Sequence, residues 1–235
     1  MPRPLRFLLV LLAVLPAPAL AQPQVSLSWD SCTGPVIVSR PPGQPISLYA
    51  SVIGQSEGHK AFQVRILLRP QGSTLPDAWR FDASGCQGLS QLAFDHYSSN
   101  PNCPQLFGDE PAVQIPDYAF DANVNRWRFV YAVAYPFGIP TANPATRYHM
   151  VRMILDHTYS TVAPTVPGET CGGFNEPMCF YLYKAEWVDM SGAERTYQVN
   201  SEYLAMNDPY QAACFSTAVP AKPATWGAIK NTYRN

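Results

Sequence analysis

The sequence predicts an all-β fold, an antiparallel β-sandwich that is stapled by disulfide bonds and carries a short C-terminal helix. Three observations point to this class. Hydrophobic residues recur at every second position in much of the chain, proline is frequent at 24 residues, and six cysteines follow an export signal. Alternation is the pattern of half-buried strands, and prolines are typical of the turns and edges around short strands.

Nine segments carry the strand pattern. In residues 61–69, Phe62, Val64 and Ile66 face one side while polar residues face the other, which makes this the clearest strand. In residues 126–135, bulky residues form one face and small residues form the other, so both faces suit burial. The other seven expected strands are residues 25–29, 46–53, 78–81, 89–94, 148–157, 179–188 and 196–199. About nine strands are enough for a sandwich.

Residues 1–21 are expected to form a cleaved signal peptide. They begin with a short basic region, continue with an apolar stretch at residues 7–15 that is too short to cross a bilayer, and end in an Ala-x-Ala motif. No cysteine follows the expected cleavage site, so no lipid anchor is expected. The mature chain, residues 22–235, is expected to form one β-sandwich domain without a transmembrane segment, secreted to the periplasm, the cell surface or the extracellular space.

The mature chain is expected to be weakly acidic. Of the 16 Lys and Arg residues, two lie in the expected signal sequence. The basic residues left in the mature chain are therefore fewer than its 17 Asp and Glu residues. The sequence has no run of Lys or Arg, and a surface that follows phosphates needs clustered basic residues. Nucleic acid is therefore not expected as a partner.

All six cysteines lie in the mature chain: Cys32, Cys86, Cys103, Cys171, Cys179 and Cys214. An even number of cysteines in an exported protein predicts three disulfides, although six cysteines allow fifteen connectivities. Proximity along the chain favours Cys86 with Cys103 and Cys171 with Cys179, which leaves Cys32 to join Cys214 and tie the two ends of the domain together. A zinc site is disfavoured because even the nearest two cysteines are farther apart than zinc-binding pairs usually are.

Four histidines are the natural acid-base candidates: His59, His96, His149 and His157. His157 directly follows Asp156, but neighbouring residues of a strand point to opposite faces, so the carboxylate cannot orient the ring within one strand. His149 and His157 flank one expected strand and are expected at its rim rather than in a catalytic or metal-binding role.

Asp121, Asn123 and Asn125 place side-chain oxygens at alternate positions, as at the start of a calcium-binding loop. The rest of that motif is missing, because Arg126 stands where the loop needs glycine and Ala132 where it needs glutamate. The segment is expected to be a β-hairpin turn. Neither a metal nor another cofactor is expected.

The sequence contains no catalytic motif that would identify a reaction. The sequence lacks a G-x-S-x-G nucleophile elbow, an H-E-x-x-H motif and a glycine loop that would cradle phosphate. Its glutamates are scattered, which neither supports nor excludes a glycosidase. No catalytic residue is predicted, and the sequence favours a non-enzymatic role.

Most aromatic residues are expected in the core, and three tyrosines near loops are the candidate ligand contacts: Tyr97, Tyr159 and Tyr210. Exposed aromatic rings form platforms for sugar rings or for a partner surface. Residues 224–234 are expected to form the short C-terminal helix, with Trp226 and Ile229 on the side that docks on the domain.

Three segments resemble a group of uncharacterised secreted bacterial proteins: Leu27-Ser-Trp-Asp-Ser-Cys32, Asp77-Ala-Trp-Arg-Phe81 and Thr225-Trp-Gly-Ala-Ile-Lys230. Those proteins look cohesin-like or immunoglobulin-like in architecture. The resemblance spans most of the mature chain, but it consists of structural tryptophans and cysteines and has no catalytic motif to transfer. Because cohesin-like sandwiches bind partner modules and related sandwiches bind polysaccharides, the resemblance implies a binding role.

The expected function is therefore that of a secreted, non-enzymatic binding or structural module, active in adhesion or scaffold interaction at the cell surface or outside the cell. Its expected partner is a protein or a polysaccharide. The alternative is a carbohydrate-binding module, which needs exposed coplanar aromatic rings. A secreted hydrolase without a recognisable motif is a third alternative, since catalytic residues from separate loops leave no local signature.

Overall fold

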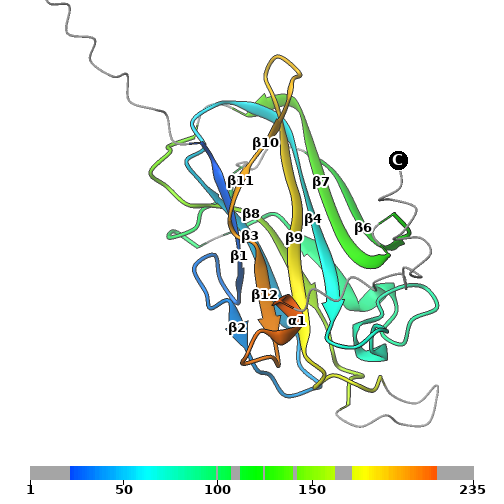
Figure 1. The fold of residues 1–235 in the computed structure, drawn as a ribbon. Coiled ribbons are helices and arrows are strands. Elements are labelled where there is room, and N and C mark those ends of the chain that lie inside the picture. Colours follow the sequence, from blue (N-terminus) through cyan, green and yellow to red (C-terminus); the bar gives the residue numbers. More distant parts are fainter. Residues whose placement is uncertain are drawn as a thin grey trace, which may run out of the picture.

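The computed structural model describes residues 22–98, 100–106, 112–123, 125–139, 142–161 and 171–215. These residues form two β-sheets packed against each other, as Figure 1 shows. All strand pairs are antiparallel except those of β1 with β11 and of β12 with β2. The expected all-β sandwich is confirmed, with two parallel pairs at its margins.

The smaller sheet has five strands in the order β11-β1-β3-β8-β5. Its central strand β3 covers the eight residues expected from the sequence and pairs with β1 and β8. The five strands are β1 (Gln24–Trp29), β3 (Ile46–Ile53), β5 (Leu92–Asp95), β8 (Tyr148–Leu155) and β11 (Gln198–Ser201).

The larger sheet has the order β2-β12-β9-β4-β7-β6, and β10 pairs with β9 beside this path. Its long central strands β9, β4 and β7 dominate the view in Figure 1. The strands are β2 (Ile37–Val38), β4 (His59–Pro70), β6 (Val113–Asp121), β7 (Arg126–Ile139), β9 (Met178–Asp189), β10 (Glu194–Thr196) and β12 (Tyr203–Met206).

The core between the sheets is rich in aromatic rings. Trp29 of β1 meets Phe180 of β9 edge to face, with ring centroids 5.1 Å apart, and Trp79 stacks on Phe174 at 5.6 Å. The indole N–H of Trp29 donates to the carbonyl oxygen of Ala205 at 3.2 Å, which satisfies its only polar atom. One cluster of buried side chains joins both sheets, so the expectation that most tryptophans are core residues is confirmed.

The strand expected at residues 78–81 is wrong. This segment contains a single 3-10 turn, η1 (Asp77–Trp79), in which the N–H of Trp79 donates to the carbonyl of Pro76 and the N–H of Arg80 to the carbonyl of Asp77. Trp79 and Phe81 are both fully buried. Their alternate spacing imitates a strand, but they anchor a loop to the core.

The other expected strands differ less from the structure in their boundaries. Residues 89–94 divide into a 3-10 turn, η2 (Leu89–Gln91), and the edge strand β5. Residues 196–199 span the junction between β10 and β11. Strand β12 was missed because its residues after Tyr203 are all buried, so it shows no alternation.

All six cysteines are paired, as expected, but the connectivity expected from chain proximity is wrong. The disulfides join Cys32 to Cys103, Cys86 to Cys171, and Cys179 to Cys214, with Cα–Cα distances of 6.2, 5.4 and 5.0 Å. Cys171 and Cys179 are not joined because Cys179 belongs to β9, where it meets the short turn of helix α1 (Ala212–Phe215). Three disulfides are typical of proteins from an oxidising compartment.

The expected signal peptide, residues 1–21, and the expected helix at residues 224–234 lie outside the described residues. Within the described ranges, no helical segment has the length and apolar character needed to cross a bilayer.

Candidate binding sites

The four histidines are buried, and for His149 and His157 this corrects the expectation that they lie at the rim of a strand. His59, His149 and His157 have no exposed surface, and His96 retains 2%. Burial disfavours the charged imidazolium, and it lowers the pKa of His157 to about 3 and the pKa values of His59 and His149 to about 4. The alternation of a strand shows which face a side chain takes, but not how deeply loops cover its end.

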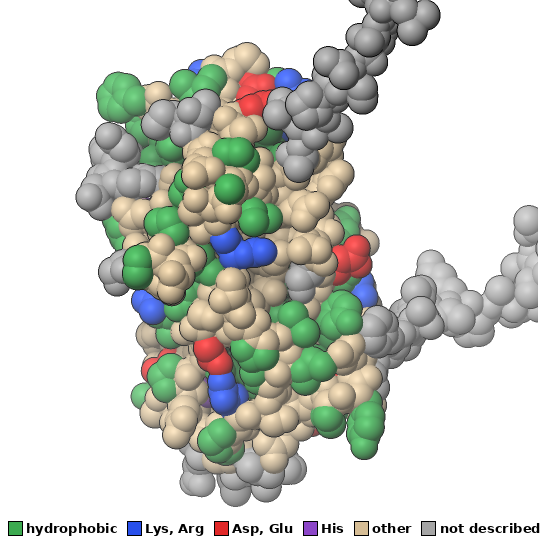
Figure 2. All heavy atoms as spheres, turned by 90° about the vertical axis from the view of Figure 1, so that its left-hand side faces the viewer, with side chains coloured by type: hydrophobic (Ala, Val, Ile, Leu, Met, Phe, Trp, Pro, Cys, Tyr) green, Lys and Arg blue, Asp and Glu red, His purple; other side chains and the backbone are tan. Residues whose placement is uncertain are grey.

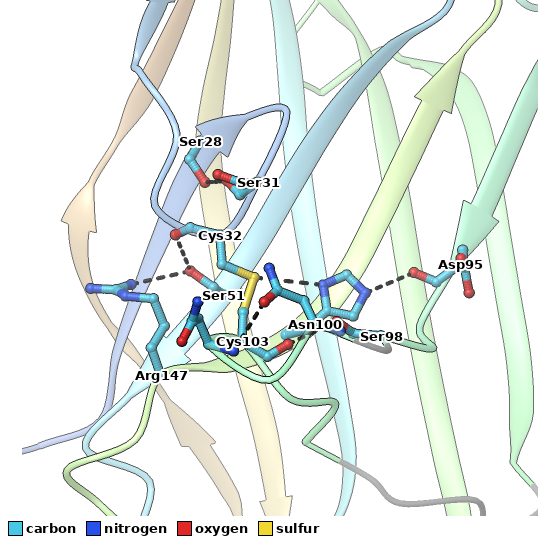
Figure 3. Close-up of a disulfide and its surroundings, with 11 residues drawn as sticks. Ser28, Ser31, Cys32, Ser51, Asp95, Ser98, Asn100, Cys103 and Arg147 are labelled. Atoms are coloured by element: carbon cyan, nitrogen blue, oxygen red, sulfur yellow. Dashed lines mark hydrogen bonds between the residues drawn. A yellow bond between two sulfur atoms is a disulfide. The ribbon is translucent and has the colours of Figure 1, made fainter.

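His149 contacts the disulfide between Cys32 and Cys103, and Figure 3 shows the surroundings of this disulfide. Its Nδ1 atom is 3.9 Å from Sγ of Cys32, and its Nε2 atom is 3.1 Å from the carbonyl oxygen of Asp95. The ring therefore connects the loop after β1 with the end of β5. With both nitrogens occupied by these contacts, His149 has a structural role.

A polar cavity of about 330 Å³ is lined in part by Cys32 of this disulfide. Asp30, Tyr49, Asp95, Tyr97, Asn100 and Arg152 are among the residues that line it. Nη2 of Arg152 lies 2.7 Å from a carboxylate oxygen of Asp95, and Arg40 pairs with Asp30. Paired charges, an amide and two tyrosines suit a polar ligand without net charge.

The three candidate tyrosines are exposed, as expected from their loop positions: Tyr97 at 51%, Tyr159 at 53% and Tyr210 at 88%. Tyr97 follows β5 and lines the polar cavity. Tyr159 lies in the turn after β8, and Tyr210 lies in the turn between β12 and α1. They belong to three separate turns, so a ligand-contact role for any of them stays a prediction.

The segment with alternate oxygens is a hairpin turn between β6 and β7. One carboxylate oxygen of Asp121 accepts the backbone N–H of Asn123 at 3.0 Å, and the other lies 2.5 Å from Nη1 of Arg128. The carboxylate is thus used by the turn itself. Among the described residues, no three His, Cys, Asp or Glu side chains gather as a metal site.

A shallow trough of about 210 Å³ crosses the outer face of the larger sheet. Its floor includes three small side chains, Ala61 of β4 and Ala132 and Ala134 of β7, together with Gln63 of β4 opposite Ala132. Ala134 pairs with Ala61 on one side and with Val113 of β6 on the other. The trough therefore follows from the small-residue face expected for residues 126–135.

The walls of the trough are apolar on one side and acidic on the other. Val113 and Ile115 of β6 are 58% and 59% exposed, and Ile115 lines the trough together with Glu186 and Glu194. Glu186 is paired with Lys184 at 2.6 Å. Exposed branched aliphatic side chains in contact with a groove are typical of interaction surfaces.

Strand β6 is also the open edge of the larger sheet, but Pro116 lies in its middle. Proline has no backbone N–H to donate to an added strand, and it is a common device that blocks pairing at sheet edges. The sheet face is therefore better suited to a partner than its edge.

Charged side chains are sparse on the face shown in Figure 2, where apolar and uncharged polar groups dominate and both signs of charge occur. Over the whole sequence, 14% of residues are charged.

No family model matches this chain, and no curated protein matches it. Solved structures of cohesin modules are similar in shape. A non-cellulosomal cohesin from Archaeoglobus fulgidus has 11% identity and a TM-score of 0.35, with 79% of this chain and 90% of that chain covered.

Two further cohesins give comparable values. A module of a family 33 glycoside hydrolase from Clostridium perfringens has 10% identity and a TM-score of 0.38 over 79% of this chain and 97% of its own. The sixth cohesin of scaffoldin B from Acetivibrio cellulolyticus, solved in complex with a dockerin, has 9% identity and a TM-score of 0.39 over 79% of this chain and 98% of its own. Because these TM-scores are below 0.5, we draw no conclusion from them, and the β-sandwich assignment rests on the two sheets themselves.

Proposed function

We propose that the protein is an exported, non-enzymatic binding module, with residues 22–235 as one domain, and that it binds a helical segment of a protein partner in the trough on its larger sheet. The exposed apolar wall beside an alanine floor is the observation that carries this proposal. Large exposed aliphatic side chains that line a groove mark an interaction surface more often than a solvent face.

The dimensions of the trough favour a helix. Its two walls belong to β6 and β9, which are three strand spacings apart, or about 14 Å. An α-helix with its side chains is about 10 to 12 Å across. Alanines on the two strands between the walls leave room for the helix to lie along the strands, with its apolar stripe against Ile115.

The acidic residues beside the trough indicate which charge the polar side of that helix should carry. Glu194 is exposed and makes no ion pair among the described residues, while Glu186 next to it is paired with Lys184. A Lys or Arg on the partner helix, directed at Glu194, would complement this wall. The partner is thus an amphipathic helix with a basic residue beside its apolar stripe.

The test compares Ala134→Arg on the floor with Ala93→Arg, a matched control at an exposed alanine of β5 in the other sheet. Proteins captured from native envelope extract are identified, and each is purified and titrated against the two variants. Because an arginine on the floor fills the trough and opposes a basic helix, Ala134→Arg should weaken binding at least tenfold. Ala93→Arg should bind like the unchanged protein. Equal binding by both variants would reject the trough as the site.

Carbohydrate binding is the second candidate function, and the polar cavity favours it. Tyr97 is 51% exposed beside Asn100 and the pair of Asp95 with Arg152. An aromatic ring next to fixed hydrogen-bonding groups can hold one sugar ring. In a pull-down on insoluble polysaccharides, Tyr97→Ala should abolish retention while Tyr210→Ala leaves it unchanged. Retention that survives Tyr97→Ala would exclude this cavity.

A further inference from the structure

The strand register places the apolar wall and the acidic wall of the trough on one face of the larger sheet. Directly paired residues of neighbouring antiparallel strands point to the same side of a sheet. One row of such pairs crosses five strands in the order Glu194, Val188, Ala61, Ala134 and Val113. The next row includes Glu186, Gln63, Ala132 and Ile115. A helix that lies along the trough therefore has Ile115 on one flank and Glu194 on the other.

The C-terminal segment, residues 216–235, has the charge that complements this acidic flank. It lies outside the described residues, and its sequence contains Lys222, Lys230 and Arg234 but no Asp or Glu. All 17 acidic residues of the chain precede it. A basic segment and an acidic wall attract each other.

The helix expected at residues 224–234 also has the apolar stripe that the trough requires. Trp226, Ile229 and Tyr233 have the spacing i, i+3 and i+7 of one helix face. With about 100° between successive residues, Lys230 and Arg234 lie on one side of Trp226, and Ile229 lies on the other side. The two basic residues thus share one flank of the stripe.

Helix α1 anchors the C-terminal segment on the face that carries the trough. Phe180 of β9 packs in the core against Trp29, and neighbouring residues of a strand point to opposite sides, so Cys179 points outward. Its disulfide with Cys214 holds α1 on this outer face.

The connection from α1 is long enough to reach the trough. Glu186 follows Cys179 by seven residues along β9, a distance of about 23 Å. The eight residues 216–223 span up to about 29 Å when they are extended. They include Pro220 and Pro223, which favour an extended connection.

We propose that residues 224–234 dock in the trough of their own chain as a short amphipathic helix, with Ile229 toward Ile115 and the basic flank toward Glu194. This inference rests on the proposed function, because it takes the trough to be a helix-binding site. A short connection gives a tethered segment an effective concentration in the millimolar range. The C-terminal segment therefore covers the trough until a partner helix displaces it.

The experiment uses the purified exported chain, with its intact mass as proof that residue 235 is present. A photoreactive amino acid at Ile115 is activated at two widely different protein concentrations, and the crosslinked peptides are identified. It should join residues 224–234 of the same chain with a yield that does not depend on concentration. The same amino acid at Leu89 should not reach this segment.

Two variants of the C-terminal segment form a matched pair. Ile229→Asp places a charge in the apolar stripe and should lower the crosslinking yield about tenfold. Asn231→Asp adds the same charge on the opposite side of the expected helix and should leave the yield unchanged. Glu194→Lys should lower the yield, and Lys230→Glu in the same chain should restore part of it.

Titration with the captured partner separates this inference from the proposed function. Ile229→Asp should bind the partner at least threefold more tightly than Asn231→Asp, because the docked segment no longer competes. If Ile115 does not crosslink to residues 224–234 while Ala134→Arg still weakens partner binding, this inference fails and the proposed function stands. If the crosslink forms but Ala134→Arg binds the partner like Ala93→Arg, the proposed function fails and the docking of the segment stands. Crosslinks between two copies, or equal yields from Ile229→Asp and Asn231→Asp, would overturn the inference.

Discussion

His157 shows at the scale of one residue how strongly this core is sealed. Its ring has no exposed surface and packs against Trp79 at 4.5 Å and Phe174 at 4.8 Å between ring centroids. Nδ1 lies 3.0 Å from the hydroxyl oxygen of Ser160. A charged imidazolium in such surroundings loses its hydration, and this loss outweighs the attraction of the Asp156 carboxylate, so the pKa of His157 is lowered.

The buried histidines predict that the protein loses stability on mild acidification. In the unfolded chain, histidine has a pKa of about 6.5, whereas burial lowers the pKa of His157 to about 3 in the native state. Below pH 6.5 the unfolded state binds protons that the native state does not, so stability is full above this pH and falls below it. The expected loss is about 2 kcal/mol per buried histidine between pH 7 and pH 5, measured by urea unfolding.

The control for this pH dependence is a chain with one buried histidine fewer. His157→Gln should reduce the loss of stability between pH 7 and pH 5, and His59→Gln is a second variant with the same expected effect. A pH profile that is flat in the unchanged protein, or that is as steep in both variants as in the unchanged protein, would contradict the role of the histidines.

Residue positions were predicted from the sequence where a side chain belongs to a regular strand. The face of β4 with Phe62, Val64 and Ile66 is buried as the alternation predicts. The depth of His149 was not predictable, because it depends on a loop that Cys103 holds across the strand end. For the same reason the polar cavity, which combines Asp30, Tyr97 and residues of β8, has no local signal in the sequence.

At the scale of elements, the disulfides join segments that the sheet order brings together from distant parts of the chain. The pair Cys86 and Cys171 closes a loop of 85 residues, and the pair Cys179 and Cys214 closes one of 35. Strand order, not distance along the chain, decides which cysteines meet. Strand segments such as β3 could be predicted from the alternation of hydrophobic residues and from the turn residues around them. The order of the strands in the sheets and the pairing of the cysteines could not be predicted.

The last disulfide fastens α1 to β9, and its removal should cost stability. In the chain-entropy model, a loop of 35 residues corresponds to about 4 kcal/mol. The double variant Cys179→Ala/Cys214→Ala should therefore unfold at a clearly lower urea concentration while the other two disulfides persist. Peptide mapping without reduction gives the second check. Peptides that join Cys171 to Cys179 would contradict the connectivity.

At the scale of the whole molecule, the residues that stabilise the sandwich differ from the residues that form its candidate binding surfaces. The aromatic core holds the two sheets together and the disulfides fasten loops and α1 to them, while Ala61, Ala132 and Ala134 on the outer face of β4 and β7 contribute little to that core. A rigid face with an alanine floor can accept a partner without rearrangement, which limits the entropy cost of binding. The polar cavity shares no lining residue with the trough on this face, so the two surfaces can be tested separately.

The most direct test of the central claim, a protein helix in the trough, is photo-crosslinking from single positions. A photoreactive amino acid at Ile115, which lines the trough, is compared with the same amino acid at Leu89, which is 55% exposed on η2. In the native envelope, Ile115 should crosslink to one protein through a helical segment with a basic residue, and Leu89 should not. Crosslinks to the same protein from both positions, or none from Ile115, would contradict the account.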